Sequence, residues 1–155
     1  MADQTITDRL AELELELPPA PAPVAAYVPA LVHDGVAQTS GQLPFVSGEL
    51  LLRGKVGREI GLDDAVAAAQ MATLNALAAL SAVVDLNKIE RVLKVVGYVA
   101  SAPDFTEQPK VINGASELLQ QIFGTRGEHA RSAVGVAVLP LDAPVEIELH
   151  VAVRQ

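Results

Sequence analysis

The sequence predicts an α+β domain in which two helices cover one face of a mixed sheet. Half of the 155 residues are hydrophobic, which favours a packed core. Segments with strand and helix periodicity follow one another in the order hairpin, helix, strand, helix and two strands, with no internal repeat. The last segment, residues 145–153, alternates strictly between apolar and polar side chains, as a strand with one buried face does.

Residues 1–23 are expected to form an N-terminal extension, and residues 24–155 the domain. Residues 5–13 predict a short amphipathic helix, capped by Thr5 with Asp8 three residues later. The proline-rich stretch at 18–23 predicts a stiff extended connector, because proline fits neither a helix interior nor a central strand. The extension either packs on the domain or on a neighbouring subunit, or it is a mobile tail.

The domain is expected to open with a hairpin. Residues 24–32 have the pattern of a strand, His33-Asp34-Gly35 that of a turn, and residues 36–40 that of the second strand. Ser47-Gly48 predicts another tight turn after Phe45. Three glycines then predict an irregular loop before the first long helix: Gly54, Gly57 and Gly61.

The two long helices alternate with the remaining strands. Residues 63–84 predict a helix, since they are rich in alanine, begin with two aspartates and contain neither glycine nor proline. A strand is expected over residues 89–101 and a second helix over 111–123, with Gly124 as its C-cap. Two strands, 132–139 and 145–153, are expected to complete the sheet.

The strand predicted at 132–139 is apolar on both of its faces. One face carries Val134, Val136 and Val138, and the other carries Ala133, Ala137 and Leu139. Such a strand is typically buried on both sides, whereas two helices can cover only one face of a sheet. We therefore expect another subunit to cover the second face.

Composition and charge exclude several classes of site. The formal net charge of −8, with 19 acidic and 11 scattered basic residues, argues against a nucleic-acid surface, which needs clustered lysine and arginine. There is no cysteine for a disulfide or a thiolate metal site. His33, His129 and His150 lack the spacing of metal ligands, so we predict no metal and no other cofactor.

No membrane partner is expected either, because no uninterrupted apolar stretch reaches membrane-spanning length. The first ten residues carry acids and lack the apolar stretch of a signal peptide, which favours a cytoplasmic location.

Arg131 and Glu146 are the residues best suited to chemistry. A guanidinium can grip a carboxylate through two hydrogen bonds, and a carboxylate can handle protons. A short turn around Pro140 joins the two strands that carry them, so the pair would form a minimal site for a small organic acid. Alternatively, Arg131 is a surface arginine in an ion pair, and Glu146 is a solvated acid like Glu148.

The C-terminal segment closely resembles the signature of the RidA/YjgF family. The matching residues are Ala130-Arg131-Ser132, Val134, Val136-Ala137, Leu139-Pro140 and Val145-Glu146-Ile147-Glu148. Further matches lie upstream at Tyr27-Val28, Ser40-Gly41-Gln42-Leu43-Pro44, Asp104-Phe105 and Val111-Ile112-Asn113. The resemblance covers residues 24 to 153.

This resemblance implies a chorismate-mutase-like fold and a homotrimer with clefts between its subunits. It further implies the hydrolysis of reactive enamine or imine intermediates of small 2-amino acids to 2-keto acids and ammonia, without a cofactor. In this family the residue at Arg131 holds the substrate carboxylate, and the residue at Glu146 orients a water molecule for attack on the imine carbon.

The resemblance also implies substrate-binding roles for Tyr27, Ser40, Gly41, Asn113 and, through its backbone carbonyl, Ala133. The residues themselves leave other interpretations open. Tyr27 is as well suited to an edge strand, Asn113 to a helix N-cap, and Ser40-Gly41 to a purely structural turn.

Two positions depart from the family pattern and predict a differently shaped pocket. Ala133 stands where the family often has cysteine, and Ser116 where an aromatic residue is common. The rival hypothesis is a non-enzymatic trimer that binds a small carboxylate or a protein partner. An endoribonuclease, an activity also attached to this family, is disfavoured by the acidic chain without a basic cluster.

Overall fold

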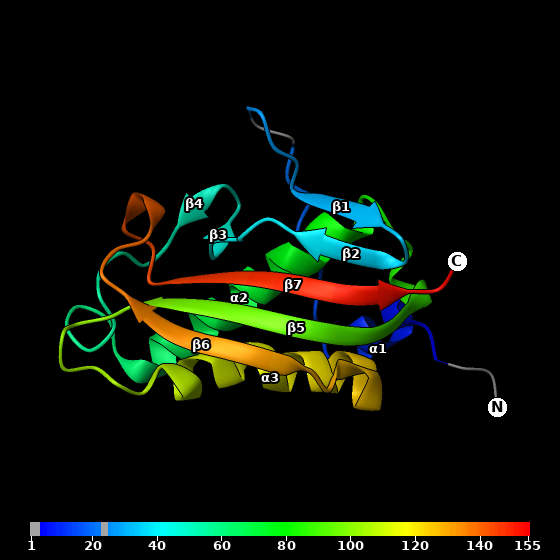
Figure 1. The fold of residues 1–155 in the computed structure, drawn as a ribbon. Coiled ribbons are helices and arrows are strands. Elements are labelled where there is room, and N and C mark those ends of the chain that lie inside the picture. Colours follow the sequence, from blue (N-terminus) through cyan, green and yellow to red (C-terminus); the bar gives the residue numbers. More distant parts are fainter. Residues whose placement is uncertain (1–3, 23–24) are drawn as a thin grey trace.

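A five-stranded mixed sheet forms the centre of the computed structural model, which describes residues 4–22 and 25–155 (Figure 1). The strands are β1 (Ala30–His33), β2 (Val36–Thr39), β5 (Ile89–Ala100), β6 (Ala130–Val136) and β7 (Val145–Val153), in the spatial order β1-β2-β7-β5-β6. β5 and β6 run parallel, and the other neighbouring pairs are antiparallel. The predicted mixed sheet is confirmed.

Two long helices, α2 (Leu62–Ser81) and α3 (Gln108–Phe123), pack against each other on the same face of the sheet (Figure 1). α2 buries small side chains, so its backbone can lie close to its neighbours. The alanines with no exposed surface at all are Ala65, Ala69, Ala72 and Ala76. Among the described residues, no helix combines the length and the apolar character needed to cross a membrane.

β7 shows why the sheet has one covered face and one open face. Its apolar residues are fully buried beneath the helices: Val145, Ile147, Leu149 and Val151. The alternate residues Glu146, Glu148 and His150 are half-buried and point to the opposite face. The predicted alternation is confirmed, and no element of the described chain covers the open face as α2 and α3 cover the other (Figure 1).

Two tight hairpins lie where the turn residues predicted them. Asp34 and Gly35 join β1 to β2 with positive φ angles of 49° and 77°. Ser47 and Gly48 likewise join β3 (Phe45–Val46) to β4 (Glu49–Leu50), with φ angles of 49° and 83°. Two-residue turns of this kind match the twist of the strands that they connect.

The short helix α1 (Ile6–Glu12), near the N-terminus of the chain, packs on α3. Thr5 and Asp8 form the predicted capping box, in which the Asp8 N–H donates to Thr5 Oγ1 at 3.0 Å. Ile6 and Leu10 are buried in the main core. The predicted boundary between residues 23 and 24 lies outside the described residues.

Several element boundaries differ from the sequence prediction, and α2 ends at Ser81 instead of residue 84. Three other differences follow from proline or from strand pairing. β1 begins only at Ala30, because Pro29 has no N–H to donate to a neighbouring strand. α3 begins at Gln108, since proline fits the first turn of a helix, where its missing N–H is not needed. β6 ends at Val136, which pairs with Ala100 at the end of β5, so no neighbour remains for residues 137–139. β6 is also an edge strand that is not buried on both sides within the single chain.

The remaining regular elements of the described chain are three short 3-10 helices. They are η1 (Leu86–Lys88) before β5, η2 (Gly124–Gly127) after α3, and η3 (Pro140–Asp142) between β6 and β7. Gly124 follows α3 with a positive φ of 63°, which agrees with the predicted C-cap.

Candidate functional site

Arg131 lies near the start of β6 and points toward the helix-covered face. Its Nη1 donates to Asn113 Oδ1 at 2.8 Å and to Ser116 Oγ at 3.1 Å, and its Nη2 donates to the carbonyl of Pro109 at 3.2 Å. All three acceptors belong to α3, which therefore fixes the half-buried guanidinium in one orientation. Asn113 lies in the second turn of α3, whose N-cap is Glu107, so its interpretation as a helix cap is wrong.

Ser116 connects the guanidinium of Arg131 to the imidazole of His129. Ser116 Oγ lies 2.8 Å from His129 Nε2, and His129 Nδ1 lies 2.5 Å from the carbonyl oxygen of Gly127. Burial, together with the nearby Arg131 charge, lowers the pKa of His129 and favours the neutral ring. Because a carbonyl only accepts, Nδ1 carries the ring hydrogen, and Nε2 accepts from the Ser116 hydroxyl.

These residues form what we call the arginine group: Asn113, Ser116, His129, Arg131 and Ala133. Ala133 faces the same side as Arg131 two residues along β6 and packs against the main core. His129 was not among the residues that the sequence pointed to. Its place two residues before Arg131 was the only signal, and its contact with Ser116 depends on how β6 passes α3.

Glu146 lies on β7 and points to the open face, where it meets the backbone of Gly41. A side chain at residue 41 would place its Cβ 2.8 Å from Glu146 Cδ and Oε1, so any other residue there would displace the carboxylate from this position. Two hydrogen bonds hold the segment in register with β7, from Gln42 N to Ile147 O at 2.8 Å and from Ile147 N to Gln42 O at 3.0 Å.

The side chain of Asn75, in α2, binds the residues that follow Gln42. Its Nδ2 donates to the carbonyls of Leu43 at 2.9 Å and Phe45 at 3.0 Å, although the side chain is almost completely buried. A buried amide that satisfies two carbonyls fixes the local path of the chain. Asn75 therefore positions the loop that carries Gly41, a role that the helical pattern around it did not reveal.

Two further polar side chains surround Glu146 on the open face. Tyr98 of β5 lies directly across from Glu146 and donates its hydroxyl to Glu148 Oε1 at 3.3 Å. Burial, together with the nearby Glu148 carboxylate, raises the pKa of Glu146. Tyr98 was not predicted as a site residue, although the alternation of residues 89–101 places its side chain on the face of the strand that is opposite to the buried Val95 and Val99.

The remaining predicted residues lie at the edge of this region. Ser40 Oγ donates to the carbonyl of Val28 at 2.7 Å, and its N–H donates to the carbonyl of Pro29 at 2.8 Å. Tyr27 is close by in sequence, and its side chain is 60% exposed. We call Ser40, Gly41, Tyr98, Glu146 and Glu148 the glutamate group.

A single chain does not bring the arginine group and the glutamate group together. β5 separates β6 from β7, so the backbones of these two strands lie about 10 Å apart. Arg131 pairs with Val95 and Glu146 with Tyr98, three residues further along β5, and the two side chains point to opposite faces. Within one chain, Arg131 and Glu146 therefore do not face each other.

Neither group has the composition of a metal centre. Across residues 4–22 and 25–155, no three histidine, aspartate or glutamate side chains gather as metal ligands.

Comparison with known proteins identifies the family. Residues 7–152 match the model of the family described as "YjgF/chorismate_mutase-like, putative endoribonuclease". The chain is 45% identical to the protein Atu1372 of Agrobacterium tumefaciens, whose crystal structure superposes with a TM-score of 0.90 over 96% of this chain and 92% of that one. It is 37% identical to Protein TCP17 of Trypanosoma cruzi, over 96% and 94% of the two chains.

A more distant solved structure carries a ligand in its description. E. coli TdcF with bound serine is 26% identical to this chain and superposes with a TM-score of 0.60, covering 88% of this chain and 94% of TdcF. The family model and the relatives of high coverage agree with the observed fold. The chain belongs to the YjgF/chorismate mutase-like family, also called RidA/YjgF.

Proposed function

We propose that this protein hydrolyses reactive enamine or imine intermediates of small 2-amino acids to 2-keto acids and ammonia. The observation that carries the proposal is the pairing of chemistries on one sheet: an arginine fixed by three hydrogen bonds and a half-buried glutamate whose pKa is raised. An imine carbon is already electrophilic, so the reaction needs little more than a held substrate and a placed water.

In this proposal, Arg131 anchors the substrate carboxylate. A guanidinium has five N–H donors, of which three are used by acceptors on α3. The two donors that remain are the number that a carboxylate takes in a bidentate grip. Since the guanidinium is already fixed, little side-chain freedom is lost when the substrate binds.

Glu146 is the proposed base. A carboxylate with a raised pKa accepts a proton from water more readily than an ordinary one, and its place against the Gly41 backbone limits its movement. Glu148 is less suited to this role, because it already accepts a hydrogen bond from the Tyr98 hydroxyl.

A second copy of the chain is needed to complete the site. The two groups point to opposite faces of the sheet, so the arginine group of one subunit must meet the glutamate group of the next. The open face also exposes apolar surface on β6, where Val134 is 44% exposed. We propose a homotrimer with such composite sites between its subunits, in agreement with the expectation from the sequence.

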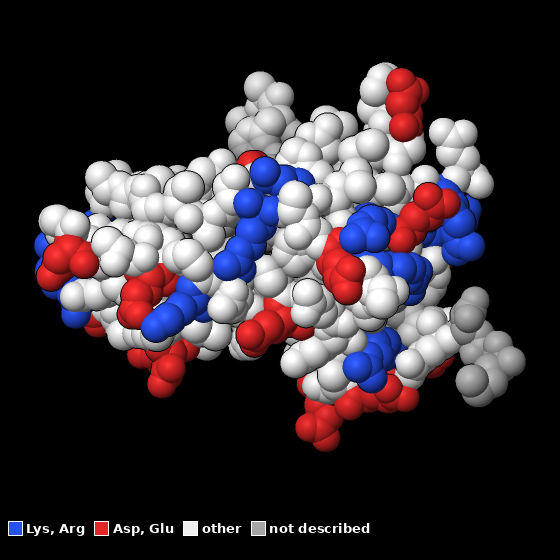
Figure 2. All heavy atoms as spheres, turned by 60° about the horizontal axis from the view of Figure 1, so that its bottom comes forward, with Lys and Arg blue, Asp and Glu red and all other residues white. Residues whose placement is uncertain are grey.

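Two other activities have less support. The serine bound to TdcF favours a small amino-acid-like ligand, which a non-enzymatic carboxylate-binding trimer would also accept. An endoribonuclease, which the family description names, would need a basic surface. Figure 2 shows acidic and basic side chains interspersed over the face that it displays, without a continuous basic patch.

Mixed oligomers test both the reaction and the composite site. Ammonia release is measured from imines that a dehydratase generates in situ, with Arg131→Ala and Glu146→Gln each expected to lose most activity. When the two variants are refolded or expressed together, about a quarter of the sites in a random trimer carry both native residues, so about a quarter of the wild-type rate should return.

Three outcomes would contradict the proposal in different ways. Mixed oligomers without recovered activity would place Arg131 and Glu146 in the same site of one subunit, or outside the site. A wild-type protein that binds 2-keto acids but releases no ammonia would favour the carboxylate-binding trimer. Glu148→Gln serves as the matched control. If it loses as much ammonia release as Glu146→Gln, the assignment of Glu146 as the base is wrong.

A further inference from the structure

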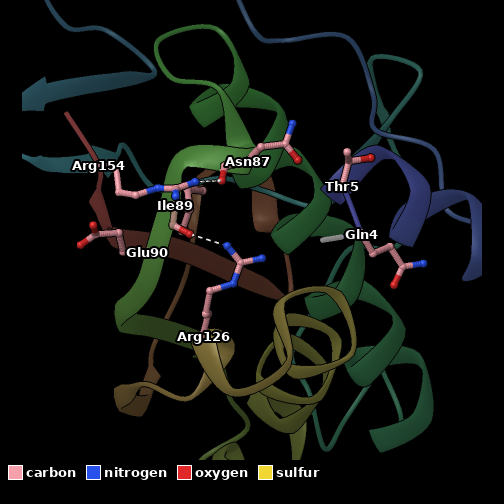
Figure 3. Close-up of a pocket in the computed structure, with 7 residues that line it drawn as sticks. All are labelled: Gln4, Thr5, Asn87, Ile89, Glu90, Arg126 and Arg154. Carbon is pink, nitrogen blue, oxygen red and sulfur yellow. Dashed lines mark hydrogen bonds between the residues drawn. The ribbon is translucent and has the colours of Figure 1, made fainter. Parts of the chain in front are cut away.

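A cavity near the N-terminal end of the described chain lies outside both groups. It has a volume of about 560 Å³, within the range of small-molecule sites, and four separate segments line it. These are Gln4 and Thr5 before α1, Asn87, Ile89 and Glu90 around the start of β5, Arg126 of η2, and Arg154 after β7 (Figure 3). None of these residues takes part in the proposed reaction.

Two guanidinium groups converge on the same short stretch of this cavity wall. Arg126 Nη1 donates to the carbonyl of Ile89 at 2.9 Å, and Arg154 Nη2 donates to the carbonyl of Asn87 at 3.1 Å. Figure 3 shows the two side chains reaching these carbonyls from different elements. The Arg154 backbone is fixed as well, because its N–H donates to the carbonyl of Lys88 at 2.9 Å.

No carboxylate within residues 4–22 and 25–155 lies within 4.0 Å of either guanidinium. Arg53 and Arg131 likewise have neutral acceptors, whereas Arg9, Arg58 and Arg91 each have an acidic neighbour. Glu90 also lines the cavity, but in Figure 3 its carboxylate points away from both guanidinium groups.

We infer that this cavity binds a small oxyanion with two or more negative charges, a phosphate compound or a polycarboxylate. Each guanidinium uses one of its five donors on a backbone carbonyl, which leaves a planar fork for bidentate contact with an oxyanion. Two such forks favour a ligand with two anionic groups over a monovalent one. Because one hydrogen bond to the backbone restrains each guanidinium before binding, part of the entropic cost of ordering it is already met.

Calorimetric titration of the full-length protein tests this site with two probes, pyrophosphate and citrate, at constant ionic strength. We expect the wild type to bind at least one of them, with acetate as the monovalent comparison. Arg126→Lys and Arg154→Lys keep the charge and a donor for the backbone carbonyl but lose the fork, and each should weaken binding by about tenfold. Arg91→Lys is the matched control, since Arg91 lies 3.9 Å from Glu128 and does not line the cavity.

The two probes and one further variant separate the outcomes. Tighter binding of pyrophosphate would identify the ligand class of the cavity as phosphate compounds, and tighter binding of citrate would identify it as polycarboxylates. Arg131→Ala should leave pyrophosphate binding unchanged, which distinguishes this cavity from the proposed active site. The inference is overturned if the wild type binds neither probe, or if the variants at Arg126 and Arg154 bind as tightly as Arg91→Lys while their urea unfolding shows an intact fold.

Discussion

The two faces of the central sheet are completed in different ways. On the helix-covered face, the apolar residues of β7 are fully buried by the chain's own helices, and α3 holds Arg131 with three hydrogen bonds. On the open face, Val134 remains 44% exposed, and Glu146 lies beside a second carboxylate. The first face is covered within a single chain, whereas the second stays open, as the proposed trimer requires.

The difference follows from strand geometry. Successive residues of a strand point to opposite faces, so Arg131 and Ala133 of β6 face the helices while Ser132 and Val134 face away. The same alternation in β7 sends Glu146 to the open face. One sheet therefore presents the arginine group and the glutamate group in opposite directions, and two copies of the chain can make them meet.

The largest expected effect comes from a charge on the open face. Val134→Asp should dissociate the proposed trimer, because an unpaired charge buried in an interface costs on the order of 3–5 kcal/mol. Sedimentation velocity would show monomers. Val83→Asp is a matched control, since Val83 is 43% exposed in the single chain and lies beyond the end of α2. If both variants sediment like the wild type, the open face of β6 is not the interface.

On the covered face, the loss of side-chain volume should lower the stability of the fold. Ile147 has no exposed surface, so Ile147→Ala should lower the free energy of unfolding by about 2–5 kcal/mol in urea titrations at fixed protein concentration. Glu148→Ala, one residue away on the open face, removes a half-buried carboxylate and its hydrogen bond with Tyr98, and should lower it by only about 0.5–1.5 kcal/mol. Equal effects of the two substitutions would remove the contrast between the faces.

A third comparison concerns the anchor itself. Arg131→Lys keeps the charge but cannot reproduce the fork or the three contacts with α3, so affinity for small 2-keto acids should fall by about tenfold or more. Isothermal titration calorimetry measures this directly. Lys110→Arg, an exposed change in the first turn of α3, should leave the affinity as it is. Unchanged binding in Arg131→Lys would rule out a bidentate carboxylate anchor.

The glutamate group should show its coupling in the pH dependence of the reaction. Glu146 acts as a base only when ionised, so the rate should fall as the pH is lowered through its raised pKa. Glu148→Gln removes a neighbouring negative charge that raises this pKa, and should move the acidic limb to lower pH. Glu117→Gln on the exposed side of α3 should not move it. If the acidic limb of the pH–rate profile stays in place in Glu148→Gln, the limb reports the ionisation of a group other than Glu146.

The smallest effect is expected from His129 in the arginine group. Its folded-state pKa lies below that of an ordinary histidine, so between the two pKa values the unfolded chain binds more protons than the folded one. Stability should therefore decrease as the pH is lowered through this window. His129→Gln should flatten that part of the curve of unfolding free energy against pH, whereas His33→Gln, at a side chain that is 80% exposed, should not. An unchanged curve for His129→Gln would contradict the neutral imidazole.

The sequence was sufficient for most elements because local patterns dictate them. The alternation of residues 145–153, the alanine-rich helix and the turns at Asp34-Gly35 and Ser47-Gly48 need no long-range information. Pro29 and Pro109 shifted two boundaries, since both prolines start or precede elements in ways that hydrophobic periodicity does not record. The burial of residues 132–139 on both sides did not occur in one chain, because it depends on which strand lies at the edge of the sheet.

The candidate site was only partly accessible from the sequence. The family resemblance pointed to Arg131, Asn113 and Glu146, and the structure places the first two in direct contact. The contacts of Asn75, Tyr98 and His129 come from segments far apart in the chain, so neither spacing nor periodicity could reveal them. That Arg131 and Glu146 point to opposite faces also required the strand order.

The alanine face of α2 has a consequence for protein engineering. Because Ala65, Ala69, Ala72 and Ala76 have no exposed surface, a larger side chain at any of them would overpack the core, at a cost of about 1–3 kcal/mol. Residues 40–44 and 130–134 carry members of the two groups and lie outside α2, although Leu43 accepts a hydrogen bond from Asn75 of that helix. A saturation library aimed at new substrates should thus draw its diversity from these two segments and keep the helix constant, since its mutational tolerance is low.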